Sequence, residues 1–380
     1  MDSLPEDGRE FLRKEEAQVK TNVKKQERLL RVGVLGCGVI CQAAHLIGST
    51  KAKNVHLQAI CDVAEDLLHK IADIYGPDSI YTDYAEMLED PRVEAVIIGI
   101  GDQFHVPCAK QAVEAGKHVL LEKPMGVSIE ECRELKELAE KKGVILQIGH
   151  MKRYDEGLQF AKKFKEEKMG EITTYKGWYC DSVGRYTLTD NVMPVLYSSE
   201  NMKKPDGNPK EILDHYYLLG HGSHLFDTAM YFMGEITEIS ARYVNRAKMH
   251  SWLIDCNFES GAIGTLDLTV AIAQLWHEGC EIYGTDGTVY AKTFNPWEFR
   301  SSIVECYDRR TDVSMTPAAY DGQFYRRELE GFADSILSGK ACSGATAQDG
   351  IMVMKALTAT YQSVQEKSRW ITLADVEGGL

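Results

Sequence analysis

Long apolar runs, an export signal and paired cysteines are all missing from this sequence. Apolar runs such as residues 96–100 are far shorter than the ~20 residues that a helix needs to cross a bilayer. The first residues show no basic start followed by an apolar stretch, so no secretory signal is expected. The 10 cysteines include no C-x-x-C pair, and without export they are expected to be free thiols. These absences predict a cytoplasmic protein that makes no membrane contact.

The sequence also has fewer positive than negative residues: 43 Lys and Arg and 57 Asp and Glu give a net charge of −14. An acidic surface repels phosphate backbones, so nucleic-acid binding is not expected. The hydrophobic fraction of 44% is that of an ordinary globular protein. A chain of 380 residues exceeds the usual size of one hydrophobic core, and two domains are therefore predicted.

The first 150 residues divide into a tail and an alternating region. Residues 1–30 are rich in Lys, Glu and Gln and are expected to form a polar, solvated helical extension. From residue 31 to 150, short apolar strands alternate with amphipathic helices, which predicts an α/β domain with a doubly wound parallel sheet, the Rossmann fold. Strands are expected at 32–35, 56–61, 93–100, 119–121 and 144–148, and helices at 64–75, 106–115 and 129–138.

From residue 151 to 380 the alternation stops. Strand-like runs at 172–179, 236–244, 262–271 and 281–283 are separated by few helices, which predicts an α+β domain with a large, mainly antiparallel sheet. Helices are expected at 158–167 and 350–366, and a short strand at 370–373. An exposed sheet face in this half favours a homodimer or homotetramer.

A glycine-rich turn follows the first expected strand and opens a helix, with the residues Gly36, Cys37, Gly38, Val39, Ile40 and Cys41. Two glycines let the backbone approach a pyrophosphate whose charge sits on the helix N-terminus. A tight turn alone also needs glycine. The next strand, however, ends at Asp62, 62 − 41 = 21 residues after Cys41, near the ~20 expected of a ribose-binding carboxylate. The pattern therefore predicts a dinucleotide site.

Asp62 also bears on which dinucleotide is bound. A carboxylate accepts hydrogen bonds from the ribose of NAD but repels the 2′-phosphate of NADP. The neighbouring residues, Val63 and Ala64, offer no arginine to neutralise that phosphate. NAD is therefore the expected cofactor.

Glu122, Lys123 and Pro124 end the strand at 119–121, at the edge where doubly wound sheets bind ligands. Lys123 is either a hydrogen-bond donor to a reacting oxygen or an ordinary surface lysine at a strand end.

Together with later motifs, these residues resemble the glucose–fructose oxidoreductase, inositol dehydrogenase and rhizopine catabolism (Gfo/Idh/MocA) family, over roughly residues 31–373. The stretch from Ala115 to Pro124 is the most specific part of the likeness. The other matching motifs are Gly36-Cys37-Gly38, Cys61-Asp62, Arg153-Tyr154, residues 222–227, residues 284–288 and Trp370-Ile371.

The resemblance implies roles for individual residues. Lys123 would contact both the substrate hydroxyl and the nicotinamide ribose, and His224 would be the general base that accepts the hydroxyl proton. The peptide bond before Pro124 would be cis, and the half from residue 151 to 380 would supply the substrate wall and a subunit interface. By position, further cofactor contacts are expected from Asp102, Gln103, His105, Glu122 and Arg153, and further substrate contacts from Tyr154 and His221.

One departure from the family concerns the residue four before His224, which is acidic in many relatives and is Gly220 here. His221 beside it either shares the proton handling or caps the helix from Ser223. His221 and His224 also form an H-x-x-H pair, but no further ligand stands at a zinc-like spacing, so no metal is predicted.

The predicted protein is an NAD-dependent oxidoreductase that takes hydride from a secondary hydroxyl of a sugar, a glycoside (at C3 in one variant) or a cyclic polyol. One alternative keeps NAD(H) tightly bound and exchanges hydride between two sugars. A second is a non-catalytic NAD-binding sensor, and a third acts on a non-sugar carbonyl. The aromatic residues Trp178, Tyr179, Trp276 and Tyr325 either stack on sugar rings or belong to the core.

Overall fold

The computed structural model describes residues 28–182, 196–203, 205–273 and 275–380, so most of the tail expected at residues 1–30 lies outside the described residues. The first strand, β1 (Leu30–Leu35), begins one residue before residue 31, where the nucleotide-binding domain was expected to start. Leu30 is fully buried, which makes it part of the core rather than of a solvated extension. No helix of the described part is long and apolar enough to cross a membrane.

The predicted doubly wound sheet is confirmed. Seven strands lie in the order β15-β6-β5-β4-β1-β2-β3, and all neighbours are parallel except β15 and β6. Alternate residues of β4 enter two different cores: Ala95 and Ile97 pack on one face, Val96 and Ile98 on the other. Burial on both faces explains why these strands are continuously apolar in sequence. The strands are β1, β2 (Val55–Cys61), β3 (Ser79–Tyr81), β4 (Ala95–Ile98), β5 (His118–Leu121), β6 (Leu146–Ile148) and β15 (Ala345–Thr346).

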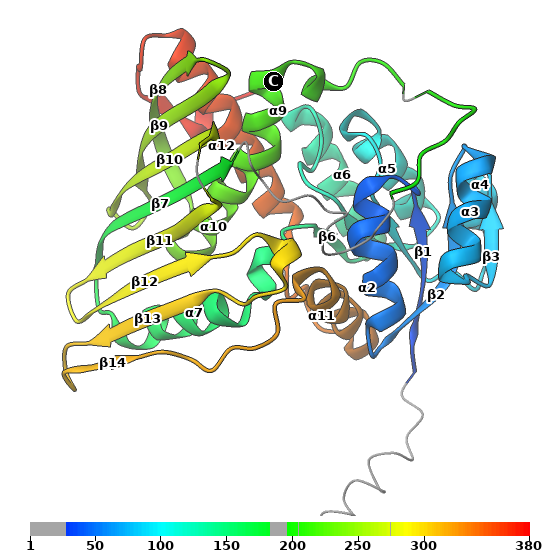
Figure 1. The fold of residues 1–380 in the computed structure, drawn as a ribbon, viewed down its shortest axis with the longest axis horizontal. Coiled ribbons are helices and arrows are strands. Elements are labelled where there is room, and N and C mark those ends of the chain that lie inside the picture. The colour runs from blue at the N-terminus through cyan, green and yellow to red at the C-terminus, as the bar shows by residue number, and fades with distance from the viewer. Residues whose placement is uncertain (1–27, 183–195, 204, 274) are drawn as a thin grey trace, which may run out of the picture.

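Helices cover both faces of this sheet (Figure 1). The predicted helix at 129–138 starts at a capping box, in which Ser128 and Glu131 bond each other's backbone, and it ends at Gly143 in the left-handed conformation. A π-helical turn, Cys41–His45, leads from the glycine turn into α2. The helices are α2 (Leu46–Lys51), α3 (Glu65–Tyr75), α4 (Tyr84–Glu89), α5 (His105–Glu114) and α6 (Ile129–Lys142).

The second sheet has nine strands in the order β14-β13-β12-β11-β7-β10-β9-β8-β16. It is antiparallel, as predicted, except that β7 and β10 run parallel. Along β9 the exposure alternates, so one face of the sheet is buried and the other is open. Its strands are β7 (Ile172–Ser182), β8 (Ile236–Arg246), β9 (Met249–Phe258), β10 (Ile263–Ile272), β11 (His277–Gly284), β12 (Gly287–Thr293), β13 (Ile303–Asp308), β14 (Val313–Met315) and β16 (Ile371–Thr372).

Helices α10 and α12 pack on the buried face of this sheet, and α12 also contacts α6 of the nucleotide half. Strands β9, β12, β13 and β14 and helix α11 were not expected from the sequence. The strand expected at 370–373 is shorter than predicted, because the chain turns into a 3₁₀ helix at Leu373. The helices are α7 (Glu156–Lys168), α9 (Leu213–Tyr217), α10 (Ser223–Met233), α11 (Phe324–Ser338) and α12 (Ala347–Gln365).

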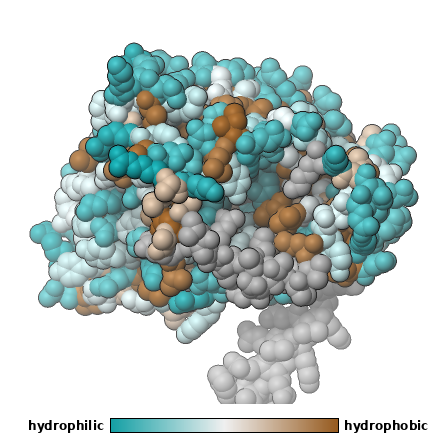
Figure 2. Space-filling model, turned by 45° about the horizontal axis from the view of Figure 1, so that its top comes forward, coloured by the Kyte–Doolittle hydropathy of each residue, from teal (hydrophilic) through white to brown (hydrophobic). Residues whose placement is uncertain are grey.

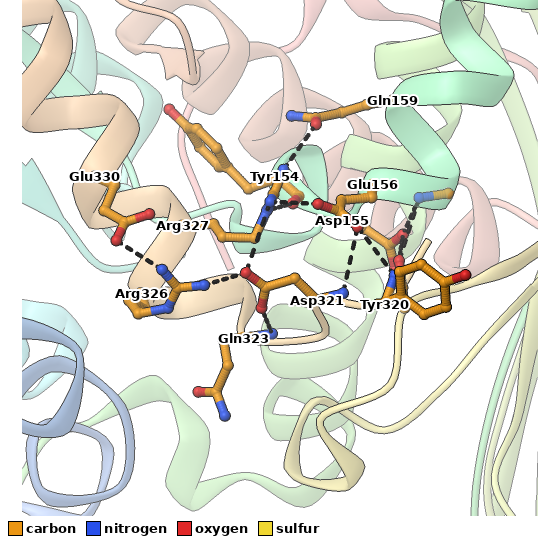
Figure 3. A network of polar contacts seen from close by, with 12 residues as sticks. Tyr154, Asp155, Glu156, Gln159, Tyr320, Asp321, Gln323, Arg326, Arg327 and Glu330 are labelled. Carbon is orange, nitrogen blue, oxygen red and sulfur yellow. Dashed lines mark hydrogen bonds and ion pairs between the residues drawn. The ribbon is translucent and has the colours of Figure 1, made fainter. Parts of the chain in front are cut away.

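Helix α11 joins the two halves through an arginine-rich network (Figure 3). Arg327 donates hydrogen bonds to the Tyr154 carbonyl at 2.8 Å, to Glu156 at 2.7 Å and to Gln159 at 3.2 Å. Arg326 bonds Glu330 and also pairs with an aspartate of the preceding loop. The same helix packs against α2, so it holds the start of α7 against the nucleotide half. The face of the molecule that Figure 2 shows is mostly hydrophilic, with smaller groups of hydrophobic residues among the hydrophilic ones.

Candidate active site

The carboxyl ends of β1, β4 and β5 form the edge where a dinucleotide would lie. The strand order reverses between β1 and β4, and doubly wound folds bind their ligands at such a switch point. Gly36 has φ of +102°, and a Cβ there would lie 2.6 Å from the Gly99 carbonyl oxygen, so only glycine fits. A Cβ on Gly38 would meet no described atom within 4 Å, so the turn stays open to a ligand. The glycine turn therefore suits a pyrophosphate.

Asp62 lies directly beside this turn. Its carboxylate accepts hydrogen bonds from the Cys37 N–H at 2.7 Å and the Ala64 N–H at 2.9 Å. Val39 is 43% exposed at the mouth of the turn, whereas Ile40 packs against the core around β1. The structure thus brings together the glycine motif and the predicted ribose-binding carboxylate. Their arrangement fits the adenosine end of NAD.

Glu122 and Lys123 leave the end of β5 on the other side of the switch point. The Lys123–Pro124 peptide bond is cis, as predicted. Glu122 bonds His45 Nε2 at 2.9 Å and accepts the Lys123 N–H at 3.1 Å. Burial opposes a charged Glu122, but His45 and Lys123 outweigh it and hold the pKa of this carboxyl at about 2. The charged carboxylate and His45 therefore fix the backbone from which the Lys123 side chain extends.

Three further predicted cofactor residues follow β4. Asp102 is buried and forms an ion pair with Lys210, whose Nζ lies 2.9 Å from Oδ2. His105 is buried with its ring nitrogens 2.7 Å from the Pro124 carbonyl and 3.2 Å from the Ile100 carbonyl, so it ties the start of α5 to the cis peptide. Gln103 stands between them on the same 3₁₀ turn. The structure thus brings all three to the edge that carries Lys123.

Lys123 and His224 converge across the two halves of the molecule. The ammonium of Lys123 donates a hydrogen bond of 3.1 Å to the carbonyl of Gly220, one turn before His224. Burial, and then the charge of Lys210, lower the pKa of Lys123 to about 8. Burial, followed by the charges of Lys123 and Lys152, holds the pKa of His224 well below its usual value. At neutral pH the lysine is therefore charged and the histidine neutral.

Aromatic rings and charged groups of the second sheet face His224. The Tyr179 ring lies parallel to that of His224, with centroids 5.9 Å apart, and edge-on to His221 at 5.3 Å. The ammonium of Lys152 lies 4.5 Å from the centroid of the Tyr179 ring and forms a buried ion pair with Glu278. These contacts form a polar, aromatic-walled site on the buried face of the sheet.

His221 stands on the π-helical turn Leu218–Gly222. Its Nε2 lies 3.8 Å from a carboxylate oxygen of Asp181, at the end of β7, and both side chains are buried. The structure thus places His221 in the cluster with His224, beside a carboxylate. Within the described residues, no group of three His, Cys, Asp or Glu side chains is placed to hold a metal ion.

Two predicted site residues lie elsewhere. Arg153 bonds Asp227 on α10 at 2.8 Å and Asp349 on α12 at 2.9 Å, so two carboxylates engage its guanidinium. The Tyr154 hydroxyl bonds Gln147 at 3.2 Å, and its ring packs under α11 (Figure 3). Neither side chain joins the cluster of Lys123 and His224. Arg153 instead fixes the helix that carries His224.

Sequence reasoning missed several groups that line the cluster: His45, Lys152, Asp181, Lys210 and Glu278. Lys152 could have been predicted as a site residue, since it directly precedes the Arg153-Tyr154 motif. The others come from segments with no motif and reach the site only through tertiary packing.

Comparisons with known proteins agree with this geometry. Residues 30–150 match the NAD-binding Rossmann fold of the Gfo/Idh/MocA oxidoreductase family, and residues 217–373 match its C-terminal alpha/beta domain. The inositol 2-dehydrogenase/D-chiro-inositol 3-dehydrogenase of Shouchella clausii is 32% identical over 355 residues, 90% of this chain and 93% of that protein. The myo-inositol 2-dehydrogenase of Thermotoga maritima is 27% identical over 368 residues, 92% of this chain and 100% of that protein.

A solved structure shows the same fold. Scyllo-inositol dehydrogenase from Lactobacillus casei, with bound NAD(H) and scyllo-inositol, aligns with a TM-score of 0.70 at 23% identity, covering 92% of this chain and 100% of that one. With both family domains matched in order, this chain belongs to the Gfo/Idh/MocA family and is an NAD-dependent oxidoreductase that acts on CH–OH groups.

Proposed function

We propose that this enzyme oxidises a secondary hydroxyl of a cyclic polyol, a sugar or a glycoside, with Lys123 and His224 as its catalytic residues. The observation that carries the proposal is the meeting of a partly buried ammonium, bonded to the Gly220 carbonyl, with the buried neutral imidazole of His224 four residues further along the chain. The inositol dehydrogenases among its relatives support a polyol or sugar as substrate. The polar groups around Tyr179 are suited to a substrate with several hydroxyls.

In this mechanism the nicotinamide of NAD, when bound, accepts the hydride. Lys123 donates a hydrogen bond to the substrate hydroxyl oxygen and stabilises negative charge that develops there. Neutral His224 accepts the hydroxyl proton. His221, beside Asp181, is placed to share that proton or to hold a second hydroxyl. Asp62, the glycine turn, Glu122 and the residues after β4 hold the cofactor.

The test is a panel of inositols, sugars and glycosides, with products identified by mass spectrometry and with and without added NAD. Oxidation of one secondary hydroxyl, at C3 if the substrate is a glycoside, is the expected result. Turnover that releases no NADH but proceeds when a carbonyl sugar is added would identify the variant that keeps its cofactor. Binding of NAD without any turnover would support a sensor and contradict the proposal.

Variants test the residue assignment separately. Lys123→Ala and His224→Asn should each lower kcat by at least about 100-fold, the usual contribution of general acid–base groups, while NAD still binds. The matched controls are Lys163→Ala and His69→Asn, whose side chains are 72% and 59% exposed. Near-normal turnover in both site variants would remove Lys123 and His224 from the mechanism.

A further inference from the structure

Lys210 brings a positive charge from the C-terminal half of the chain to the edge of the parallel sheet at the end of β4. It stands on a 3₁₀ turn, Pro209–Glu211, 108 residues along the chain from its partner Asp102. Its Nζ lies 3.0 Å from Oδ1 and 2.9 Å from Oδ2 of that carboxylate. The Asp102 side chain is only 6% exposed and that of Lys210 21% exposed, so solvent screens the pair weakly.

The segment that carries Lys210 is attached to the nucleotide half at two other places. The Gln42 side chain bonds the backbone of Tyr197 in both directions, at 2.9 Å each, and also the Cys37 carbonyl of the glycine turn at 2.7 Å. Asp66, in the first turn of α3, accepts hydrogen bonds from Ser199 Oγ and the Glu200 N–H. The described residues of 196–212 thus run past α3 and the glycine turn to Asp102 (Figure 1).

Asp102 occupies a position where charge matters to the cofactor. It follows β4, and the nicotinamide half of a dinucleotide lies on the β4–β5 side of the switch point. The nicotinamide ring is a cation in NAD⁺ and neutral in NADH. A carboxylate near the ring therefore favours the oxidised cofactor, whereas an ammonium favours the reduced one. Asp102 and Lys210 together present nearly no net charge.

We propose that Lys210 is a positioning residue: it neutralises the charge that Asp102 would otherwise present to the nicotinamide. The pair would thereby set the ratio of the enzyme's affinities for NAD⁺ and NADH. The ion pair thereby fixes how far hydride transfer proceeds on the enzyme. Lys123 and Glu122 are present in all variants considered below. Because the charge of Lys210 itself lowers the pKa of Lys123, the dissociation constants are compared well below pH 8, where Lys123 stays protonated. The proposal rests on NAD binding and not on the identity of the substrate.

The experiment measures dissociation constants of NAD⁺ and NADH without substrate, after removal of copurified nucleotide. Lys210→Met leaves Asp102 unbalanced and should raise the ratio Kd(NADH)/Kd(NAD⁺) by about tenfold. This is the order expected for one uncompensated charge about 12 Å from the ring at an effective dielectric constant of about 20. Asp102→Asn should lower the ratio by a similar factor, and the double variant should return it close to the wild-type value. Lys210→Arg, which keeps the charge, should also leave the ratio close to the wild-type value.

The matched control is Lys203→Met, which removes an exposed lysine from the same segment and should leave the ratio unchanged. Equal changes in both dissociation constants would mean that the pair only anchors the segment, and this would overturn the proposal. An unchanged ratio in both single variants would do so as well. Because no turnover is measured, failure of the substrate panel leaves this result intact.

Discussion

At the residue scale, the catalytic pair depends on two protonation states that burial and neighbouring charges maintain. Lys123, Lys152, His150 and His221 all add positive charge beside His224 when they are protonated, and with burial they disfavour its imidazolium form. Burial also makes Lys123 a weaker cation, with its pKa lowered to about 8. The two groups thus leave a pH window in which one is neutral and the other charged.

We expect kcat/KM for alcohol oxidation to be level across this window and to fall on both sides. Below the lowered pKa of His224, which lies well under 6.5, the base is protonated and oxidation slows. Above the pKa of Lys123, about 8, the ammonium is lost and oxidation slows again. A pH profile of kcat/KM measures both limits. A rate that keeps rising well above pH 8 would contradict the role of charged Lys123.

Asp62 provides a second prediction at this scale. Its carboxylate is held by two backbone N–H groups at the turn, so it should repel the 2′-phosphate of NADP. We expect wild-type kcat/KM to be higher with NAD than with NADP. Asp62→Ser with Val63→Arg should narrow or reverse the preference, since it removes the negative charge and adds a phosphate partner at a position that is 70% exposed. Better turnover of the wild type with NADP would show that Asp62 does not select the cofactor.

Arg153 should matter to stability. Replacement by Met would leave the Asp227 carboxylate, whose side chain is 3% exposed, without its contacts to the guanidinium Nε and Nη2. This should lower the free energy of unfolding by about 3–5 kcal/mol. Denaturant unfolding measures the loss. The control, Arg133→Met, breaks an ion pair with Glu377 whose partners are 38% and 54% exposed, and it should cost less than about 1 kcal/mol. Equal losses would show that the buried network does not anchor α10.

The site residues whose positions could be predicted from the sequence are those that lie in a short motif of known function. Asp62 and the glycine turn are joined by known spacing, and Lys123 and His224 lie in stretches that resemble the family. Lys210 and His45 were not predicted, because their partners are 108 and 77 residues away and only the folded chain brings them together. Arg153 and Tyr154 were predicted from a motif, but a motif does not say which way its side chains point.

At the element scale, the segment at residues 196–203 depends on Asp66 for its place on the nucleotide half. Asp66→Asn weakens the acceptor for Ser199 Oγ and the Glu200 N–H while keeping the side-chain shape. We expect faster amide hydrogen exchange across 196–203, measured by mass spectrometry. The control is Asp83→Asn at the N-cap of α4, where the carboxylate accepts the Ala85 N–H. Unchanged exchange in Asp66→Asn would show that other contacts hold the segment.

Some elements with a long periodic pattern were predicted, whereas others with such a pattern, the strands β9 and β12 and the helix α11, were missed. The predicted strand at 56–61 and helix at 64–75 agree with β2 and α3 to within one residue. Strand β15 has only two residues, too few to show any alternation. Strand β12 does alternate in burial, so a signal was present there that the sequence reading did not use.

At the scale of the whole molecule, the open face of the nine-stranded sheet is the expected subunit interface. Leu253, Ile263, Tyr290 and Ile303 are 42–58% exposed, and the strand registers place Leu253 and Ile303 on the same face. We predict a dimer or tetramer by light scattering, and a shift to smaller species with Ile303→Glu. Ile74→Glu, on α3, is the control. A monomeric wild type would contradict this.

The nucleotide-binding sheet is finished by β15, which pairs with β6 although the two strands lie 345 − 148 = 197 residues apart in the chain. A ribosome making this protein must therefore translate past residue 346 before that sheet acquires its last edge strand. A polypeptide released at residue 150 would lack β15, α11 and α12, and would leave the apolar sides of α2 and α6 bare. The two halves have different architectures, yet the nucleotide-binding half completes its fold only with strands and helices from the second half.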